Sequence, residues 1–308
     1  MKENQVSRTA LLMAYVRGYH ATRGTLKIFE DNLAQQLLTE EERAIFEEQF
    51  TPPLQLIEAV DPAGAASCCD RAARLAWALR VIPSASHSLS RSRYTEDALE
   101  ESVREGVKQY VILGAGMDTF AYRRPDLLDQ IQVFEVDHPA TQAFKRSRMA
   151  EIGRDQPEKL HFVPVDFTKE SLATALTRSS YDPKALSFFS WLGVTYYLPR
   201  EAVLAALRAF ADIAPQGSSV IFDYMDTDAF VPGRAAKRIQ MSMEKCREWG
   251  EPLITGFDPA TLAANLAGSG LHLNEDLSPA DIQELYFKGR TDGYYACEHV
   301  HFAWAVVE

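Results

Sequence analysis

The stretch that decides the fold we expect is Val111-Ile112-Leu113-Gly114-Ala115-Gly116-Met117-Asp118-Thr119. A hydrophobic run ends in Gly-x-Gly, and glycines after a buried strand let the backbone turn sharply and approach a ligand closely. The dinucleotide-binding pattern has a third glycine where this chain has Thr119, because a helix N-terminus meets a pyrophosphate there. Asp118 places a negative charge at this turn instead. The turn therefore favours a cofactor with positive charge and no phosphate, such as S-adenosylmethionine.

Around this turn, apolar runs of strand length alternate with helical patterns. The expected strands are Tyr110–Leu113, Gln132–Val136, His161–Val165, Leu186–Trp191 and Ser219–Tyr224. The expected helices are Thr141–Ile152, Ser171–Thr177, Arg200–Ile213 and Pro259–Ala267. Such alternation predicts an α/β fold with a doubly wound, mostly parallel, seven-stranded Rossmann-like sheet. The last two strands are Leu271–Leu277 and Glu298–Val307. Because no helix follows the final strand, we expect it to enter the sheet antiparallel.

The residues before the first strand are predicted to be helical. Helical spacing of apolar residues indicates helices at Val6–Tyr19, Arg43–Phe50 and Cys69–Leu79, with Pro83 closing the third. We therefore divide the chain into a helical extension at residues 1–108 and a sheet domain at residues 109–308. A helical insertion is expected at residues 226–250 of the sheet domain. We expect the extension and the insertion to shape the substrate pocket.

Composition and charge exclude several classes of protein. The 308 residues carry a net charge of −11, which argues against a nucleic-acid partner because such affinity rests on clusters of Lys and Arg. No apolar run approaches ~18 residues, so we predict no membrane span. The polar start, Met1–Gln5, lacks the apolar core of a signal peptide. The four cysteines show no CxxC spacing, which favours free thiols in a reducing cytoplasm. We expect a monomer or a homodimer.

Acidic residues end the two strands that follow the glycine turn. Asp137 comes about 20 positions after Gly114, where an acid can accept hydrogen bonds from ribose hydroxyls. Asp166 ends the next strand, where its carboxylate can accept from an adenine amino group while Phe167 flanks the ring. His138 is expected to border the same cofactor. The alternative is that acids at such positions only cap the helices that follow them.

Longer segments carry a resemblance to a known family. They are Val6-Ser7-Arg8-Thr9-Ala10, SRSRY (90–94), QYVILGAGMDTFAYRRP (109–125), VFEVDHP (133–139), FVPVDF (162–167), SFFSWLGVTYYLPREAV (187–203), GEPLITGFDP (250–259), EDL (275–277) and YFKGR (286–290). In this order they resemble successive motifs of the leucine carboxyl methyltransferase family. This family is a branch of the class I S-adenosylmethionine-dependent methyltransferases. The resemblance covers nearly the whole chain and implies this fold, this cofactor and a methyltransferase activity.

The resemblance also implies roles for single residues. Carried over by position, it implies cofactor contacts for Gly114, Asp137, Asp166 and Phe167. It further implies that Arg91, in the helical extension, grips the cofactor's carboxylate. The eukaryotic members that methylate a protein phosphatase carry a glutamate just after the fourth strand, where this chain has Trp191-Leu192-Gly193. The bacterial small-molecule branch is therefore the closer match, and we expect a small-molecule acceptor.

Methyl transfer from a sulfonium is an in-line displacement, and correct positioning meets much of its barrier. A carboxylate acceptor is already anionic and needs a cationic or hydroxyl clamp, whereas a phenol or alcohol profits from a general base. The chain offers clamps: Tyr196 and Tyr197 follow the fourth strand, and Arg290 lies near the C-terminus. We predict these three as catalytic residues. We favour an O-methyltransferase acting on a small carboxylate, with a phenol or alcohol as the alternative acceptor.

Several alternatives stay open at this point. One of the tyrosines can simply pack in the core, and Arg290 can form a surface ion pair. Arg17 is a further clamp candidate and His20 a candidate base. The histidines of His299-Val300-His301 share one face of a strand without an evident third ligand, so we predict no metal site. A nicotinamide-dependent oxidoreductase and a non-catalytic ligand-binding protein are the competing classes of function.

Overall fold

The computed structural model describes residues 7–24, 26–167 and 169–308. The polar start and Val6, the first residue of the first predicted helix, lie outside these residues. Within them, one sheet has the strand order β3-β2-β1-β4-β5-β7-β6. Its strands are β1 (Gln109–Leu113), β2 (Gln132–Asp137), β3 (Leu160–Pro164), β4 (Ser187–Trp191), β5 (Ser219–Met225), β6 (Leu271–Leu277) and β7 (Val300–Val307).

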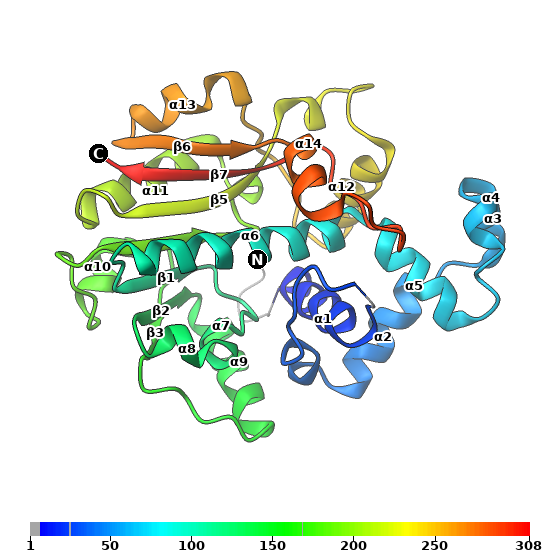
Figure 1. Ribbon diagram of the computed structural model, residues 1–308, viewed down its shortest axis with the longest axis horizontal. Helices are drawn as coiled ribbons and strands as arrows, with labels where there is room; N and C mark the ends of the chain where they lie inside the picture. Colours follow the sequence, from blue (N-terminus) through cyan, green and yellow to red (C-terminus); the bar gives the residue numbers. More distant parts are fainter. Residues whose placement is uncertain (1–6, 25, 168) are drawn as a thin grey trace.

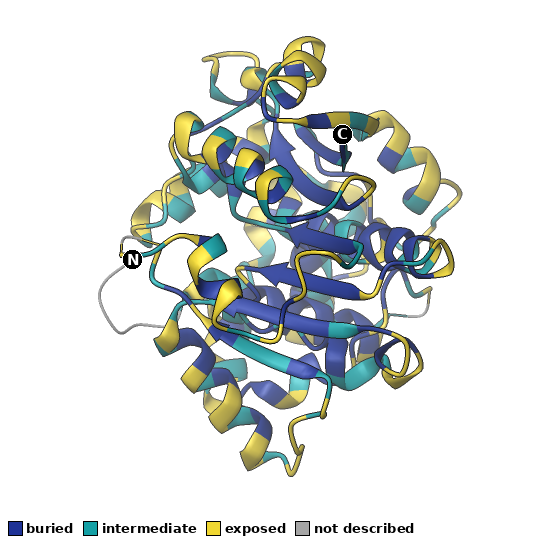
Figure 2. Ribbon diagram, turned by 90° about the vertical axis from the view of Figure 1, so that its left-hand side faces the viewer, coloured by how far each residue is buried: buried dark blue, intermediate teal, exposed yellow. Residues whose placement is uncertain are grey.

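Strands β1 to β5 pair in parallel, and β7 runs antiparallel to both β5 and β6. The predicted α/β sheet and its antiparallel final strand are therefore confirmed. Strands β1, β4 and β5 are buried along their whole length, because helices cover both faces of the sheet. Figure 2 shows these strands in dark blue, enclosed by helices whose outward faces are exposed. In β6, at the edge of the sheet, the central residues are intermediate or exposed.

Helices fill the chain before β1. They are α1 (Arg8–Arg23), α2 (Glu40–Phe50), α3 (Leu54–Val60), α4 (Pro62–Ala65), α5 (Arg71–Val81) and α6 (Pro83–Arg104), with a short 3-10 helix η1 (Ala34–Leu37). The prediction that Pro83 only closes a helix was incomplete, because Pro83 also begins α6. Proline is well tolerated in the first turn of a helix, where its missing N–H is not needed. The buried face of α6 carries Ser86, Ser88 and Ser90, so apolar periodicity does not reveal this helix.

The other helices alternate with the strands or follow them. They are α7 (Phe120–Arg123), α8 (Pro125–Leu128), α9 (Pro139–Glu151), α10 (Leu172–Thr177), α11 (Arg200–Ile213), α12 (Lys237–Glu248), α13 (Pro259–Ala267) and α14 (Pro279–Ile282), with the short turns η2 (Thr195–Tyr197), η3 (Thr227–Phe230) and η4 (Gln283–Phe287). In Figure 1, α6 runs lengthwise across one face of the sheet. Helices α1, α2, α12 and α14 gather on the right-hand side, where the parallel strands end.

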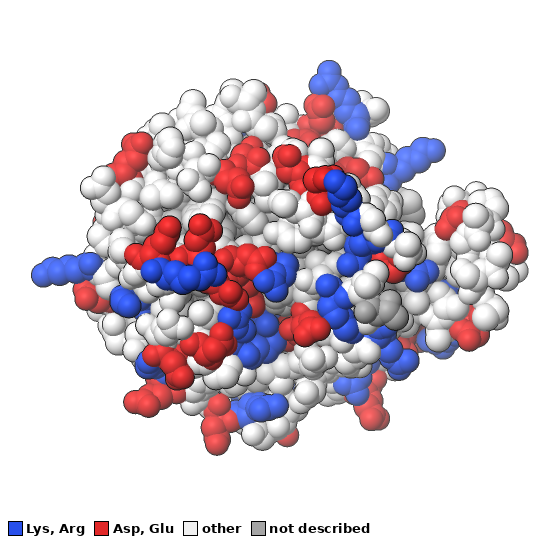
Figure 3. Space-filling model, viewed as in Figure 1, with Lys and Arg blue, Asp and Glu red and all other residues white. Residues whose placement is uncertain are grey.

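The helical extension and the sheet share one hydrophobic core. It contains Tyr15 of α1, Leu99 of α6 and Ile112 of β1. The division at residue 108 stays a prediction, but the two parts are packed together. On the face seen in Figure 3, acidic and basic side chains lie close together over α6 and the helices below it. Among the described residues, no helix is long and apolar enough to cross a bilayer.

A buried ion pair joins β2 to α9. Lys145 Nζ lies 2.5 Å from Glu135 Oε2, and both side chains are 1% exposed. Burial raises the pKa of Glu135 to about 7, although the charge of Lys145 opposes this shift. We expect Lys145→Met to lower the free energy of unfolding by about 3–5 kcal/mol, because it leaves a buried carboxylate without its counter-charge. Urea denaturation measures this loss.

The control for this prediction is the exposed ion pair between Arg93 and Asp97, whose side chains are each 44% exposed. Arg93→Met should cost less than about 1 kcal/mol, since water screens this pair. Adding Glu135→Leu to Lys145→Met should recover most of the lost stability. Equal losses in the two single variants would contradict the prediction.

Candidate functional site

The glycine turn after β1 has the backbone conformation that only glycine adopts easily. Gly114 has φ +64° and Gly116 has φ +50°. The backbone N–H of Gly116 donates to Asp137 Oδ2 over 2.6 Å. A Cβ on Gly114 would lie 3.0 Å from Val194 Cγ2, in the loop after β4. The structure thus brings together the predicted cofactor turn and the predicted ribose acid.

Asp137 ends β2 with its carboxylate already oriented. Its Oδ1 accepts from the backbone N–H of His138 over 2.6 Å, and burial raises its pKa. Each oxygen keeps a further lone pair that can accept from a hydroxyl. The ring of His138 has a structural task, because its Nδ1 accepts the N–H of Ala140 at the start of α9. His138 therefore stays beside the predicted site while its Nδ1 is engaged.

Asp118 and the residues around it make this part of the edge acidic. Asp118 Oδ1 accepts the backbone N–H of Phe120 over 2.7 Å, so it stabilises the start of α7. This contact of Asp118 is of the kind expected if acids at such positions cap the helices that follow them. Besides burial, the charges of Asp118 and Asp137 raise the pKa of Glu135. Glu135 itself is paired with Lys145, so Asp118 and Asp137 are the two acids near this turn that favour a ligand with a positive centre.

The predicted adenine residues lie one strand further along. Asp166 follows β3, which pairs with β2 so that Asp137 lies opposite Pro164. Lys169 Nζ is 2.7 Å from Asp166 Oδ2. The ring of Phe167 is 57% exposed and is free to cover a planar ligand. The structure places both residues at the same edge of the sheet as the glycine turn.

A buried polar cluster surrounds Arg91, which comes from α6. Arg91 Nη1 donates to Asp223 Oδ2 over 2.8 Å and to the hydroxyl of Tyr196 over 3.2 Å. His87 Nε2 lies 2.6 Å from the same Asp223 oxygen. The backbone N–H of Gly193 donates to Asp223 Oδ1 over 2.6 Å. The two predicted residues Arg91 and Tyr196 are therefore neighbours, joined by Asp223.

Sequence reasoning missed His87 and Asp223. His87 lies one helical turn before Arg91, and Asp223 is the only charged residue in the apolar strand β5. An acid in a fully buried strand must be paired with a cation or with hydrogen-bond donors. Asp223 in such a strand could therefore have indicated that partners of this kind lie nearby. The charge of Arg91 and the hydrogen bond from His87 hold the pKa of Asp223 well below its usual range, although burial alone would raise it.

The other members of the cluster are neutral. Burial, and next to it the charge of Arg91, lowers the pKa of His87. Burial raises the pKa of Tyr196 well above its ordinary value. At neutral pH the cluster therefore contains one cation, Arg91, and one anion, Asp223. His87 then donates its Nε2–H to that anion.

The remaining predicted residues lie in two places. The ring of Tyr197 meets that of Tyr196 edge-on at 4.9 Å, and burial raises the pKa of Tyr197. Arg290 is 2.5 Å from Asp292 Oδ2 and donates to the carbonyl of Leu26. Within the described residues, the polar contacts of Arg290 do not include either tyrosine. In this structure Arg290 forms an ion pair, as the alternative to a catalytic role expected. The catalytic role of Arg290 stays a prediction.

The first helix covers the glycine turn. Arg17 Nη2 donates to the carbonyl of Met117 over 2.7 Å, and Arg17 Nε to Asp31 over 2.9 Å. A Cβ on Gly116 would lie 3.4 Å from the Cβ of Ala10. Arg17 therefore attaches α1 to the turn. The clamp role considered for it stays a prediction.

The predicted insertion meets the start of α1. The guanidinium of Arg8 lies 5.4 Å from the ring centre of Trp249, and Thr9 donates to Glu251. Met241 is 67% exposed, so it does not belong to the core. The segments that we expect to shape the pocket therefore contact each other.

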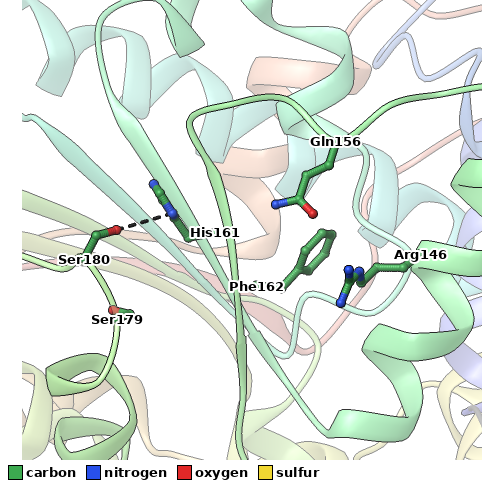
Figure 4. Close-up of a pocket in the computed structure, with 6 residues that line it drawn as sticks. All are labelled: Arg146, Gln156, His161, Phe162, Ser179 and Ser180. Carbon is green, nitrogen blue, oxygen red and sulfur yellow. Dashed lines mark hydrogen bonds between the residues drawn. The ribbon is translucent and has the colours of Figure 1, made fainter.

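A hollow of about 340 Å³ lies elsewhere on the surface. Figure 4 shows the residues that line it. The hollow lies beside the first residues of β3, away from the carboxyl end of that strand. His161 Nδ1 lies 3.3 Å from Ser180 Oγ, and His161 Nε2 lies 2.7 Å from Gln132 Oε1. The polar atoms of this histidine are therefore engaged within the chain, and the hollow is separate from the candidate site.

The chain is similar to known proteins along its whole length. Residues 10–211 match the family model described as leucine carboxyl methyltransferase. The chain is 36% identical over 313 residues to the Bacillus subtilis (strain 168) protein named "Putative S-adenosyl-L-methionine-dependent methyltransferase YktD", covering 99% of each. It also resembles the crystal structure of a DUF574 family protein from Streptomyces avermitilis, with a TM-score of 0.57, 11% identity and 99% of both chains covered.

A second solved structure gives the same result. It is titled as a putative methyltransferase from Thermobifida fusca, with a TM-score of 0.55 and 13% identity, covering 100% of this chain and 97% of that one. At such identities the two solved structures show a shared fold alone.

Gly193 tests the geometry of the Arg91 cluster. It has φ +74°, and a Cβ there would lie 2.8 Å from Arg91 Nη2. We expect Gly193→Ala to displace the guanidinium and weaken binding of S-adenosylhomocysteine, measured by titration calorimetry, by about tenfold or more. Gly153→Ala is the matched control, because Gly153 has φ +69° and no atom within 4 Å of a Cβ.

Both alanine variants should lose about 1 kcal/mol of stability from the backbone conformation alone. Only Gly193→Ala should lose ligand affinity. If the two variants bind S-adenosylhomocysteine equally well, Arg91 does not contact the ligand in the expected way.

Proposed function

Because this chain belongs to the leucine carboxyl methyltransferase family and is an S-adenosylmethionine-dependent methyltransferase, we propose that it methylates an oxygen of a small molecule, namely a carboxylate. The product is then a methyl ester. When bound, the cofactor supplies a methyl group on a positively charged sulfur. The family assignment leaves the oxidoreductase alternative without support.

The residues at the carboxyl edge fit this cofactor. Asp137 offers acceptors for a ribose, and the acids around the glycine turn suit a sulfonium and an ammonium. Arg91 offers a cation for the cofactor's carboxylate, and Phe167 an exposed ring for the adenine. The ribose, the adenine and the charged groups of the cofactor thus each have a counterpart in the chain.

We choose a carboxylate as the acceptor because the histidines around this edge are engaged in hydrogen bonds within the chain. His87 donates to Asp223, and His138 Nδ1 accepts from Ala140. His20 Nε2 accepts the N–H of Ile28 over 2.9 Å, and burial lowers the pKa of His20 to about 4. These histidines hold the fold together, so they are poorly placed to take a proton from a substrate.

The other two histidines considered are engaged as well, and only His301 lies in β7, because His299 precedes the strand with φ +65°. His299 Nδ1 lies 2.9 Å from Asp226 Oδ1, and His299 Nε2 accepts from Ala236 at the start of α12. His301 stacks on Tyr224 at 4.9 Å. Among the described residues, no group of three or more metal-binding side chains is present. An acceptor that is already an anion needs no base, and a carboxylate meets that condition near neutral pH.

Tyr197 is the clamp that we propose for the acceptor. Burial keeps its hydroxyl protonated and able to donate, because it raises the pKa. Tyr197 lies beside Thr9 at the start of α1, and beside Cys246 of α12. A hydroxyl donor can orient a carboxylate without removing the charge on its attacking oxygen.

The nature of the product tests this proposal. The enzyme is incubated with methyl-labelled S-adenosylmethionine and matched acceptors, such as benzoate against phenol and octanoate against octanol. We expect label transfer to the carboxylates, in a product that releases labelled methanol in alkali, as a methyl ester does. Alkali-stable label on the phenol or alcohol would show an ether-forming enzyme instead and would overturn the choice of acceptor.

The pH dependence gives a second test. Burial lowers the pKa values of His20 and His87, so both stay neutral near and above neutral pH. For a carboxylate acceptor we expect kcat/KM to be flat between about pH 6 and 8.5, and to fall below about pH 5 as the acceptor is protonated. A rate that climbs steadily through this range would indicate an acceptor that must lose a proton.

A further inference from the structure

We propose that Asp223 is a positioning residue for the cofactor's amino-acid end, because it holds the Arg91 guanidinium against Gly193. This inference rests on the proposed role of Arg91 in binding the cofactor's carboxylate. It adds a residue of β5, far from the glycine turn in sequence, to the machinery that binds the cofactor.

Asp223 is built into the fold as an acceptor for several elements at once. Its side chain is 0% exposed. Oδ2 accepts from Arg91 over 2.8 Å and lies 2.6 Å from His87 Nε2, both on α6. Oδ1 accepts the N–H of Gly193, in the loop after β4, over 2.6 Å. The hydroxyl of Tyr196 lies 3.4 Å from Oδ2. The carboxylate therefore fixes α6, β5 and the loop after β4 relative to each other.

The contacts of Arg91 leave part of the guanidinium available. Its hydrogen bonds to Asp223 and Tyr196, and its 3.5 Å approach to His87, all involve Nη1. Nη2 lies against Gly193, where a Cβ would be 2.8 Å away. Arginine has five N–H donors in a planar fork, so one side can be held while the other binds a carboxylate.

The physical effect of Asp223 is preorganisation. An arginine side chain has many rotamers, and fixing it only when the ligand arrives would cost affinity. With Asp223 in place, the guanidinium keeps one orientation before binding. His87 and Tyr196 complete the hydrogen bonds of the carboxylate, so the buried anion is satisfied without moving Arg91. Asp223 thus acts through Arg91 and does not itself need to touch the cofactor.

Two ligands separate this role from a general effect on folding. S-adenosylhomocysteine carries the amino-acid end of the cofactor, whereas 5′-methylthioadenosine has the same nucleoside without it. We expect Asp223→Asn to weaken binding of S-adenosylhomocysteine by about tenfold or more in titration calorimetry. Binding of 5′-methylthioadenosine should change by less than about twofold. The amide keeps the shape but loses the charge that holds Arg91.

The control is Asp276→Asn. Asp276 of β6 accepts from the hydroxyl of Tyr224, which like Asp223 lies in β5, over 2.8 Å. Among the hydrogen bonds and ion pairs of the described residues, Asp276 has none with Arg91. It should leave the affinity for both ligands unchanged. Asp223→Glu is the second variant if Asp223→Asn does not fold. It keeps the charge and displaces it by one methylene, so the same selective loss is expected.

Unchanged affinity of the Asp223 variants for S-adenosylhomocysteine would overturn the proposal, and so would equal losses for the two ligands. Arg91→Met distinguishes the role of Arg91 from that of Asp223. If it reduces the preference for S-adenosylhomocysteine while the Asp223 variants do not, Arg91 binds the carboxylate without help from Asp223. If it has no effect on that preference, the proposed role of Arg91 fails as well.

Discussion

A charge inside a sheet of apolar strands is tolerated only when it is paired, and this constraint shapes the whole carboxyl edge. Asp223 in β5 is paired with Arg91 of α6. Glu135 in β2 is paired with Lys145 of α9. In each case the strand supplies the acid and a helix supplies the cation. The helices that carry these cations are therefore held in one position over the sheet.

The same constraint explains why the helical extension belongs to the site. Arg17 of α1 forms a buried ion pair with Asp31 and also donates to the carbonyl of Met117 in the glycine turn. Arg91 reaches the loop after β4 from α6. A sheet without these helices would have the turn and the acids but no cation for the far end of the ligand. In the proposed cofactor site, the extension therefore supplies the cation and the sheet supplies the turn and the acids.

Features that are local in sequence could be predicted, and features that depend on distant contacts could not. Apolar runs indicated β1 and β2, and regular periodicity placed α11 and α13 at their observed bounds. Helix α6 was missed because small polar residues form much of its buried face. Its serines pack against neighbours that no sequence window contains. Hydrophobic periodicity in the sequence indicates a helix only where the buried face of that helix is apolar.

The same distinction between local motifs and distant contacts applies to the residues of the candidate site. Gly116 and Asp137 belong to short motifs, and the structure joins them by a hydrogen bond. The contact between Arg91 and Asp223 spans 132 positions of the chain. No spacing rule predicts such a pair. Tyr196 was predicted as a substrate clamp from its place after the fourth strand, but here its hydroxyl accepts from Arg91. Tyr197 is therefore the better placed of the two to meet an acceptor.

The arrangement of charges along the edge has a direction. The acids Asp118 and Asp137 lie near the ends of β1 and β2, whereas Arg91 lies against Asp223 of β5 and Gly193 in the loop after β4. S-adenosylmethionine also has a direction, with a ribose and adenine at one end, a sulfonium in the middle, and an amino-acid group that carries an ammonium and a carboxylate at the other end. Because the strands are parallel, their order in the sheet fixes the order of these charges in space. In the proposed binding mode, the sheet therefore sets the direction in which the cofactor lies, and Asp223 keeps Arg91 in place at the end that binds the carboxylate.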